Sequence, residues 1–435
     1  MKRIAPRTLR WLTTLALVFF LALSAAAAPK QIAKNVILLI GDGMGAAERQ
    51  LATYYAGQKL EMDRMPMAGL MTTESADSLV TDSAAAATAM ATGFKTKNGM
   101  ISVTPDGKPV PTVLERAKER GLATGLVATS TITHATPACF ASHVASRASE
   151  ASIADQYFEE GVDVLFGGGT DFFLPKAVGG ARTDDRNLIE DFKAKGYLVA
   201  LDAADLKDIN RLPALGLFSE EGMQPEIDRK ATNEPSLAEM TAKAIELLSQ
   251  DKDGFFLMVE GSQIDWAGHA NDPIYNITDT LAFDAAVAVA RRFALRNPDT
   301  LVIVAADHET GGLSLGQGKN YFLKLDILRN QQYSGQFIAG LVGEDRSQVA
   351  EAMKDYAGIE SLTSDELKTL TTEKKLDLAI NKVMSDRAGL GWASYAHTAV
   401  PVPVTAEGAN AELFGGVYDN TDFAKKMAEA MGLIL

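Results

Sequence analysis

Short apolar runs alternate along the chain with alanine-rich segments of helical character. Five runs rich in Val, Ile, Leu and Phe have the length of buried β-strands: Val36–Ile40, Leu122–Ala128, Val162–Phe166, Phe255–Val259 and Leu301–Ala305. The pattern between and after them predicts helices at Ser83–Thr92, Val113–Arg120, Pro137–Ala148, Ser236–Ser249 and Thr278–Arg292. This alternation predicts an α/β fold, a three-layer sandwich in which helices flank a central, mostly parallel β-sheet.

Two segments depart from this pattern. Residues 320–388 are rich in Glu, Lys and Asp without strong strands, and we expect a helical cap insertion there. At the amino terminus, basic residues precede the apolar run Trp11–Leu23, and small residues follow as far as Ala28. This order predicts a signal peptide at residues 1–28, because the run is shorter than the roughly 20 residues of a membrane-spanning helix. We expect an exported protein, periplasmic or secreted, with a main domain at residues 29–435 and no stable membrane anchor; an uncleaved anchor is the alternative.

The charge and cysteine content exclude several classes of function. The net charge is −14, and removal of residues 1–28 would take away four basic residues, leaving 42 − 4 = 38 against 56 acidic residues, or −18. Such a chain lacks the basic face of a nucleic-acid-binding protein, so we expect no nucleic-acid partner. The single cysteine, Cys139, cannot form a disulfide within the chain. Any metal site must therefore use His, Asp and Glu.

Acidic residues stand where three of the predicted strands end. Asp42 follows the first strand, Glu260 follows the fourth, and Asp307 and His308 come directly after the fifth. In an open parallel sheet these ends meet at one edge, where ligands bind. The carboxylates would repel one another there unless cations lie between them.

The segment Gly41–Ala46 allows a second interpretation, because it fits the glycine pattern of a dinucleotide-binding turn. A dinucleotide site also needs an acidic residue about 20 positions later, which Glu61 or Asp63 could supply. Asp42 counts against this interpretation, because its carboxylate would face the pyrophosphate.

Three histidines are candidate metal ligands. Two of them stand close to an acidic residue in the sequence, and the third lies far downstream. Asp265 and His269 are one helical turn apart, His308 adjoins Asp307, and His397 lies in a later segment. Together they could form two sites of mixed His and carboxylate ligands, which suits Zn²⁺, although each could equally be a hydrogen-bonded core histidine. His143, within a predicted helix, is taken as structural.

Other residues have both a structural and a functional interpretation. Ser83 opens a predicted helix, either as part of an N-cap or as a serine placed where helix amides favour an anion. Thr136 and Pro137 are typical of an N-cap followed by proline at the first helical position. Arg147 is expected on the surface of a helix.

Taken together, these segments closely resemble alkaline phosphatase over essentially the whole chain after residue 28. The matching segments are Leu39–Gly45, Val80–Ala86, His134–Pro137, Ser146–Arg147, Glu260–His269, Asp307–Gly312 and His397–Thr398. The resemblance implies hydrolysis of phosphate monoesters to an alcohol and inorganic phosphate, with an alkaline pH optimum and a phosphoserine intermediate. It also implies that Ser83 is the nucleophile and that Arg147 clamps the phosphate.

The same resemblance implies two Zn²⁺ ions and one Mg²⁺ ion. Asp265, His269 and His397 would hold the first zinc, and Asp42, Asp307 and His308 the second. Asp42, Thr136 and Glu260 would hold the magnesium. The family is generally homodimeric, so a homodimer is expected.

The chain departs from the best-known bacterial pattern at two positions around the third metal site. His134 stands where that pattern has Asp, and Trp266 where it has Lys. We expect His134 to make the third site less selective for Mg²⁺, because imidazole suits Zn²⁺. Two alternatives stay open: a metal-dependent phosphodiesterase of the same superfamily, and a non-catalytic exported protein that binds metal or phosphate.

Overall fold

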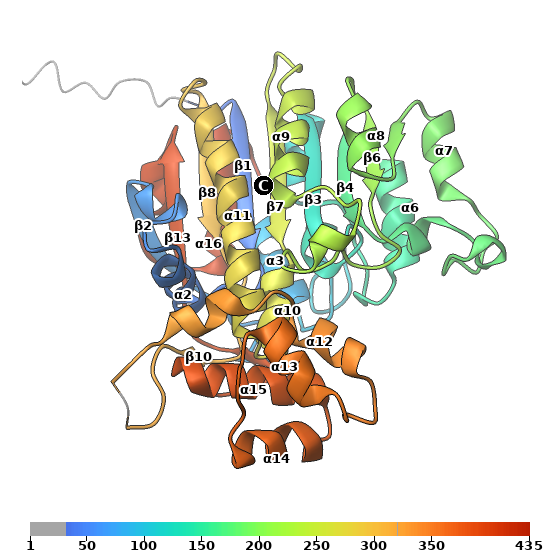
Figure 1. Cartoon of the computed structure of the whole chain (residues 1–435). Helices are drawn as coiled ribbons and strands as arrows, with labels where there is room; N and C mark the ends of the chain where they lie inside the picture. Colours follow the sequence, from blue (N-terminus) through green and yellow to red (C-terminus); the bar gives the residue numbers. More distant parts are fainter. Residues whose placement is uncertain (1–31, 320) are drawn as a thin grey trace, which may run out of the picture.

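A twisted ten-stranded β-sheet forms the centre of the computed structural model, which describes residues 32–319 and 321–435 (Figure 1). The strand order is β14-β2-β13-β8-β1-β7-β3-β4-β6-β5. All neighbouring strands in this sheet are parallel except at β13, which runs antiparallel to both β2 and β8. The bounds are β1 Asn35–Gly41, β2 Met67–Thr72, β3 Ala123–Thr131, β4 Val164–Gly168, β5 Leu198–Ala200, β6 Ala214–Leu217, β7 Phe255–Gly261, β8 Thr300–Ala305, β13 Val402–Gly408 and β14 Gly416–Asp419.

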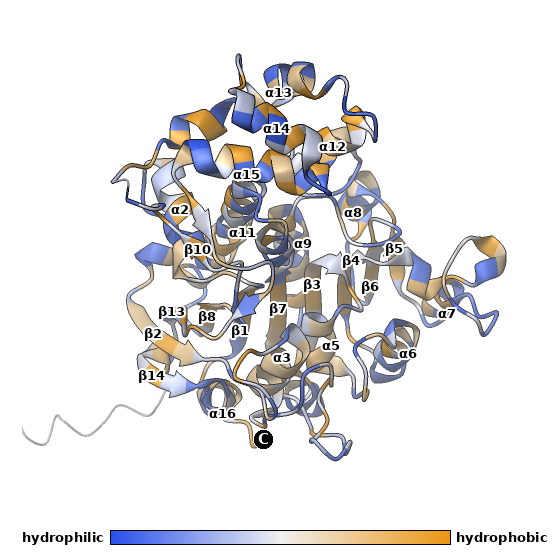
Figure 2. Cartoon of the chain, turned by 90° about the horizontal axis from the view of Figure 1, so that it is seen from below, coloured by the Kyte–Doolittle hydropathy of each residue, from blue (hydrophilic) through white to orange (hydrophobic). Residues whose placement is uncertain are grey.

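Helices cover both faces of this sheet, which confirms the predicted α/β class. Helices α2, α9 and α11 pack on one face, and α3, α4, α5 and α16 pack on the other (Figures 1 and 2). The bounds are α2 Ala46–Ala56, α3 Ser83–Thr92, α4 Val113–Glu119, α5 Ala135–Ala141, α6 Glu150–Glu160, α7 Leu188–Ala194, α8 Ala203–Asp208, α9 Leu237–Leu248, α10 Gln263–His269, α11 Pro273–Ala294 and α16 Asn420–Met431.

The central strands end in register at one edge of the sheet. Strand β1 lies between β7 and β8, so that Ile40 is level with Glu260 on one side and with Ala305 on the other. Residues Val36–Ile40 are fully buried, as expected for a parallel strand covered on both faces. The chain segments that follow these three strands therefore begin side by side.

The prediction of a helix at Pro137–Ala148 is wrong in its second half. Helix α5 ends at Ala141, and Ser142 is already extended. The backbone of Val144 then exchanges two hydrogen bonds with Ile101, at 2.9 and 3.1 Å, in an isolated bridge. This pairing satisfies the backbone groups that a longer helix would have used.

A helical segment lies beyond the sheet edge where the central strands end. Residues 325–388, called here the helical segment, contain a 3₁₀ helix at Leu325–Asn330 and helices α12 Gly335–Val342, α13 Val349–Ala357, α14 Ser364–Thr372 and α15 Leu376–Ala388 (Figure 1). Its apolar side chains form a second core cluster, separate from the core around the sheet. Within residues 32–319 and 321–435, no helix is long and apolar enough to cross a bilayer.

Candidate functional site

The side chains singled out in the sequence meet where β1, β7 and β8 end. Asp42 follows β1, Glu260 lies near the end of β7, and Asp307 and His308 follow β8. All four side chains are fully buried. Asp265 and His269 come from α10, which begins two residues after β7, and His397 comes from a two-residue strand, β12 His397–Thr398.

One cluster consists of Asp265, His269 and His397. His269 Nδ1 lies 2.7 Å from the carbonyl oxygen of Tyr395, and His397 Nδ1 lies 2.8 Å from that of Thr81. A carbonyl oxygen can only accept, so each Nδ1 carries a ring proton and each Nε2 is the atom that faces the cluster. The two Nε2 atoms are 3.1 Å apart, and each lies 3.4 Å from an oxygen of Asp265. The two Nε2 atoms and the Asp265 carboxylate thus offer a nitrogen and oxygen donor set for one cation.

A second cluster surrounds the hydroxyl of Ser83. His308 Nε2 lies 3.2 Å from Ser83 Oγ, 3.5 Å from Asp42 Oδ1 and 3.1 Å from Asp307 Oδ2. Asp42 Oδ1 and Asp307 Oδ2 are buried, and neither has a hydrogen-bond donor among the described residues. The other oxygen of Asp307 accepts the N–H of Gly43 at 3.2 Å. These unpartnered acceptors lie around His308 Nε2, beside the serine. The candidate ligand atoms that lie within 4.8 Å of one another here belong to Asp42, Asp265 and His308, so Asp265 stands closer to this set than Asp307 does.

A third cluster lies on the other side of Asp42. Candidate ligand atoms of Asp42, His134 and Glu260 all lie within 4.8 Å of one another. Thr136 donates its hydroxyl to Asp42 Oδ2 at 3.4 Å, and Ser130 donates to Glu260 Oε2 at 3.4 Å. Glu260 Oε1 is buried and has no partner in the part of the chain that is described. Hydroxyl and carboxylate oxygens together are the donor set that Mg²⁺ prefers.

Burial and mutual repulsion perturb these carboxyl groups. Burial raises the pKa of Asp42 well above its ordinary value, and the neighbouring carboxylates, Asp307 foremost, raise it further. Burial also raises the pKa of Glu260. Four carboxylates in such a space require positive charge, and the site could not hold a pyrophosphate at Asp42. The dinucleotide-binding interpretation of the glycine loop is therefore wrong.

Ser83 is the first residue of α3, and Arg147, in a loop, binds the residue before it, Asp82. Asp82 caps this helix by accepting the N–H of Ala85 at 2.9 Å, so the sequence correctly indicated a helix start here. Arg147 donates to Asp82 Oδ2 at 3.0 Å and to His134 Nε2 at 2.9 Å. Burial, with the charge of Arg147, lowers the pKa of His134 to about 4, so this imidazole is neutral at physiological pH.

Two local predictions about this region are wrong. Thr136 does not cap α5: His134 takes the N-cap position, and Thr136 lies in the first turn with its hydroxyl on Asp42. Arg147 lies between α5 and α6 rather than on a helix, and its backbone N–H binds the carbonyl of Gly99 at 2.8 Å. In both cases the residue contacts a partner far away in the sequence, which a local pattern does not show.

Sequence reasoning missed Thr310 and the role of Asp82 as a partner of Arg147. Thr310 donates its hydroxyl to Asp265 Oδ1 and also lies 3.3 Å from His308 Nδ1, so it touches both the first and the second cluster. A threonine two residues after a candidate ligand was the available signal, but its partner lies 45 residues away in the sequence.

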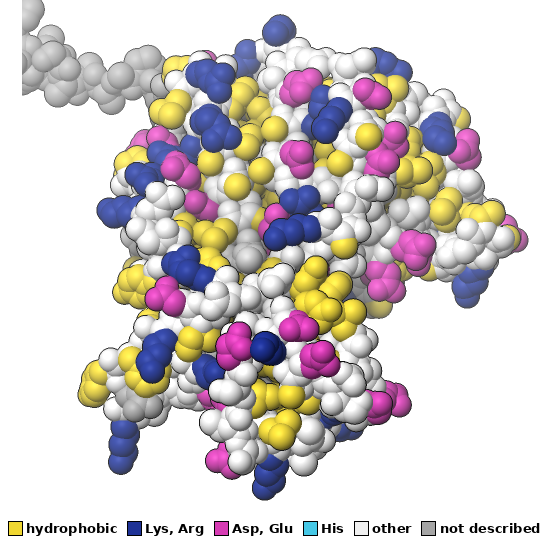
Figure 3. All heavy atoms as spheres, in the orientation of Figure 1, with side chains coloured by type: hydrophobic (Ala, Val, Ile, Leu, Met, Phe, Trp, Pro, Cys, Tyr) yellow, Lys and Arg dark blue, Asp and Glu magenta, His cyan; other side chains and the backbone are white. Residues whose placement is uncertain are grey.

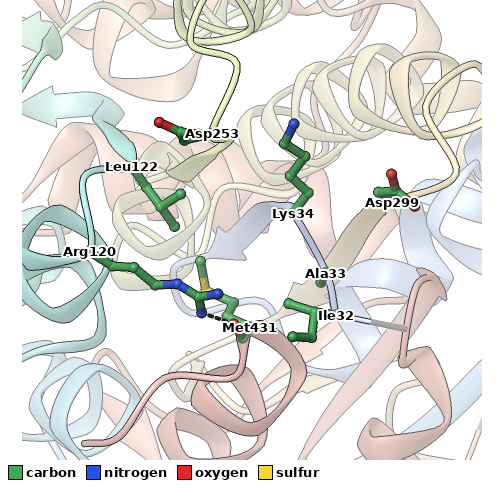
Figure 4. A pocket seen from close by; sticks show the side chains of 8 residues that line it. All are labelled: Ile32, Ala33, Lys34, Arg120, Leu122, Asp253, Asp299 and Met431. Atoms are coloured by element: carbon green, nitrogen blue, oxygen red, sulfur yellow. Dashed lines mark hydrogen bonds between the residues drawn. The ribbon is translucent and has the colours of Figure 1, made fainter. Parts of the chain in front are cut away.

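Two cavities help to delimit the site. One, of about 380 Å³, lies behind His134 and Trp266, whose rings meet edge to face at 6.1 Å. The other, of about 420 Å³, lies at the opposite end of the sheet, near the start of β1, and is lined by Lys34, Arg120 and Asp253 among others (Figure 4). None of the residues lining it belongs to the three clusters.

Comparison with known proteins gives one consistent result. A sequence model of the family described as alkaline phosphatase matches residues 33–433. Alkaline phosphatase 3 of Bacillus subtilis (strain 168) is 40% identical, with 98% of this chain and 97% of that protein covered.

Solved structures agree with the sequence matches. The alkaline phosphatase of Thermus thermophilus is 34% identical with a TM-score of 0.85, covering 93% of this chain and 92% of that one. A histidine-to-aspartate variant of the alkaline phosphatase from the Antarctic bacterium TAB5, described with Mg bound in its M3 site, is 31% identical with a TM-score of 0.73. That comparison covers 94% of this chain and 100% of the TAB5 chain.

Proposed function

The chain belongs to the alkaline phosphatase family and is a metal-dependent phosphomonoester hydrolase, and from this premise we propose that it works through a phosphoserine at Ser83, with an alkaline pH optimum. The observation that carries the proposal is the position of His308 Nε2, which lies 3.2 Å from Ser83 Oγ and within 3.5 Å of one oxygen of Asp42 and one of Asp307. These two carboxylate oxygens are buried and have no partner within the described residues. That arrangement suits a nucleophile activated by metal ions.

We assign two zinc ions and one magnesium ion to the three clusters. Asp265, His269 and His397 hold one zinc, Asp42, Asp307 and His308 hold the second, and Asp42, Thr136 and Glu260 hold the magnesium. The mixed nitrogen and oxygen donors of the first two clusters suit Zn²⁺, and the oxygen-rich third suits Mg²⁺. The magnesium described in the M3 site of the TAB5 variant supports this assignment. Trp266 is a neighbour of the third site. His134 lies among the candidate ligand atoms of that cluster, and we keep it as a neighbour rather than a ligand because its Nε2 accepts from Arg147.

When bound, the ions lower the pKa of the serine hydroxyl and stabilise charge on the oxygens of an in-line displacement. Six positive charges against four buried carboxylates leave two, and Arg147 adds one. An acidic protein can in this way hold a positively charged pocket for a phosphate dianion.

The chain's own groups then account for the reaction in two steps. Ser83 Oγ gives up its proton to solvent and attacks phosphorus, and the bond from phosphorus to the ester oxygen breaks. The departing alkoxide takes a proton from solvent and leaves as the alcohol. Water then attacks the phosphoserine, the bond from phosphorus to Ser83 Oγ breaks, and the water's proton returns to Ser83 as inorganic phosphate is released. Arg147, held by Asp82 and His134, orients two phosphoryl oxygens, and the positive end of the α3 dipole favours the charge that develops there.

We propose that the protein is exported, periplasmic or secreted, through a signal peptide at residues 1–28. These residues lie outside those that the structure describes. Basic and acidic side chains are interspersed on the face in Figure 3 rather than gathered in a basic patch, which supports the expectation of no nucleic-acid partner. The helical segment remains a proposed cap insertion. Cleavage can be checked by the mass of the secreted protein.

A homodimer is proposed through the surface beside β14. Val417 on this outermost strand is level with Leu70 on β2, and both side chains are exposed. Exposed Phe94 precedes Lys95, which binds Asp419 at the end of the same strand at 2.9 Å. An exposed apolar sheet edge favours pairing with a second copy. Light scattering should give twice the chain mass, and Val417→Glu should reduce it.

The first experiment tests the metals. Hydrolysis of p-nitrophenyl phosphate at alkaline pH should stop after EDTA treatment and return when Zn²⁺ and Mg²⁺ are added together. A phosphodiester and a sulfate ester serve as comparison substrates and should turn over far more slowly. Faster cleavage of the diester would instead favour the phosphodiesterase.

A second experiment tests the nucleophile. The Ser83→Ala variant should lose nearly all turnover while keeping its metals, and covalent ³²P labelling should locate to Ser83 in the wild type only. Turnover of the variant within a few-fold of wild type would rule out the phosphoserine. No turnover and no labelling in the fully metallated wild type would leave a non-catalytic binding protein.

A further inference from the structure

Glu309 links the loops that carry two of the candidate ligands. It follows His308 directly and is buried. One of its oxygens accepts the hydroxyl of Thr398, the residue after His397, and the other accepts the backbone N–H of Leu313 at 3.1 Å. One carboxylate thus binds both segments, which are 89 residues apart in the sequence.

The backbone around Glu309 shows why this link matters. Strand β9, Glu309–Thr310, pairs antiparallel with β12, and Thr398 lies opposite Glu309. A ribbon of two residues on each side is marginal by itself. The rings of His308 and His397 nevertheless stack at 3.6 Å with an angle of 18° between their planes. The hydrogen bond from Thr398 to Glu309 adds a side-chain contact to a backbone pairing of only two residues on each strand.

Behind Glu309 lies a second buried carboxyl that the proposed chemistry does not use. Glu48 on α2 is fully buried, and neither oxygen has a hydrogen-bond partner within the described residues. Burial raises the pKa of Glu48 well above its ordinary value, and the charge of Glu309 raises it further. A Cβ at Gly45 would lie 2.3 Å from Glu309 Cγ and 2.8 Å from Glu48 Oε2. The last glycine of the Gly41–Gly45 loop therefore leaves the space that these two carboxyl groups occupy.

We propose that Glu309 is a positioning residue that holds His308 and His397 in the relative placement required for the metal centre, with Thr398 as its link and Glu48 closing the pocket behind it. This inference rests on the proposed zinc sites. A carboxylate is suited to the task because it accepts from two donors at once, Thr398 and Leu313. A side chain with fewer than two acceptors would lose its hydrogen bond to either Thr398 or Leu313, and the segment of that residue could then move relative to the other.

The test compares Glu309→Ala and Thr398→Val with Thr405→Val as a matched control. Thr405 is a buried threonine on β13 whose hydroxyl contacts Met65 Sδ rather than the site. Zinc affinity is measured on the full chain by competition with a chromophoric chelator. The geometry of the ligands is followed by the visible absorption of the Co²⁺-loaded protein, and stability by urea unfolding after EDTA treatment.

We expect Glu309→Ala to weaken zinc binding by about 10- to 100-fold, as removal of residues that orient metal ligands generally does, and Thr398→Val by about 10-fold. Both should shift the Co²⁺ spectrum, whereas Thr405→Val should leave affinity and spectrum unchanged. If Glu309→Ala does not fold, Thr398→Val decides, because it removes only the hydroxyl.

Unchanged zinc affinity and an unchanged Co²⁺ spectrum in Thr398→Val would overturn the inference, even if the metal-free protein became less stable. The proposed function fails in a different way. In that case the wild type itself would bind no zinc tightly, or would not hydrolyse p-nitrophenyl phosphate when loaded.

Discussion

Asp82 connects the start of helix α3 to the arginine assigned to the phosphate. One oxygen accepts the N–H of Ala85 and caps the helix, and the other accepts the N–H of Gly99 at 2.9 Å and Arg147 Nη1 at 3.0 Å. Asp82→Asn can keep the cap, but its NH₂ group would face the N–H of Gly99 and Arg147 Nη1, so these two hydrogen bonds are lost. Asp82→Ala removes all three hydrogen bonds. The two variants therefore separate the cap from the support of Arg147.

The structure gives a magnitude for each part. A helix N-cap contributes about 1 kcal/mol, and an ordinary hydrogen bond contributes about 1 kcal/mol. The side chains of Arg147 and Asp82 are 28% and 21% exposed, so solvent screening keeps their ion pair near about 1 kcal/mol. We expect Asp82→Asn to lower the free energy of unfolding by about 2 kcal/mol and Asp82→Ala by about 3 kcal/mol.

Inhibition by inorganic phosphate measures the effect on the site. Arg147 would lose one of its two side-chain partners in both variants, so phosphate should inhibit about 10-fold more weakly, which corresponds to about 1.4 kcal/mol. Stability is measured by urea unfolding after EDTA treatment. Asp419→Asn is the control, because Asp419 caps α16 and binds Lys95 away from the clusters. This control should lose stability but keep the phosphate inhibition constant.

Two results would refute this reasoning. If Asp82→Ala is inhibited by phosphate as strongly as the wild type, Asp82 does not hold Arg147 for phosphate binding. If Asp82→Asn and Asp82→Ala lose the same stability, the carboxylate does not act as a helix cap.

Two further predictions concern the third site and the pH dependence of stability. Trp266→Lys adds a cation that could bridge to phosphate through water, so product inhibition should tighten; an unchanged phosphate inhibition constant would contradict this. Burial alone would lower the pKa of His143, but the hydrogen bonds to Glu115 at 2.7 Å and to the carbonyl of Ser102 raise it above 6.5. The stabilisation is therefore complete below pH 6.5 and is lost as the pH rises through the folded-state pKa. The difference in unfolding free energy between wild type and His143→Gln should shrink from pH 5.5 to 8.5, and a constant difference would refute the ion pair.

Elements whose signals are local were predictable from the sequence. Helix α3 begins and ends as predicted, because Asp82 caps it and Gly93 ends it in the left-handed conformation, at φ 78°. The buried strands followed from their apolar runs. Helix α11 begins at Pro273 rather than Thr278, although Asp272 and Pro273 form a readable cap and first turn.

Residues whose conformation depends on distant partners could not be placed in this way. Arg147 leaves the helical pattern because Asp82, 65 residues earlier, and His134 bind its guanidinium. Thr310 matters through Asp265, which only the fold brings near. The acidic and histidine residues at the strand ends were recognisable because parallel strands share one edge, but their pairing required the structure.

The helical segment is packed against the main domain through a shared core, unlike a lid that moves on a hinge. Its apolar cluster includes Ile274 and Ile277 of α11, and the buried carboxylates of Asp228 and Asp272 accept the backbone N–H groups of Ser334 and Gly335 at 2.9 and 2.7 Å. Moving the helical segment away from α11 would expose this shared core and leave both carboxylates without their hydrogen-bond donors. Separation of the segment from the main domain therefore amounts to partial unfolding. Its central amides should then exchange with solvent in concert with the first turns of α11. The range of esters that the enzyme accepts would accordingly be set by the fixed position of the helical segment and not by a closing motion.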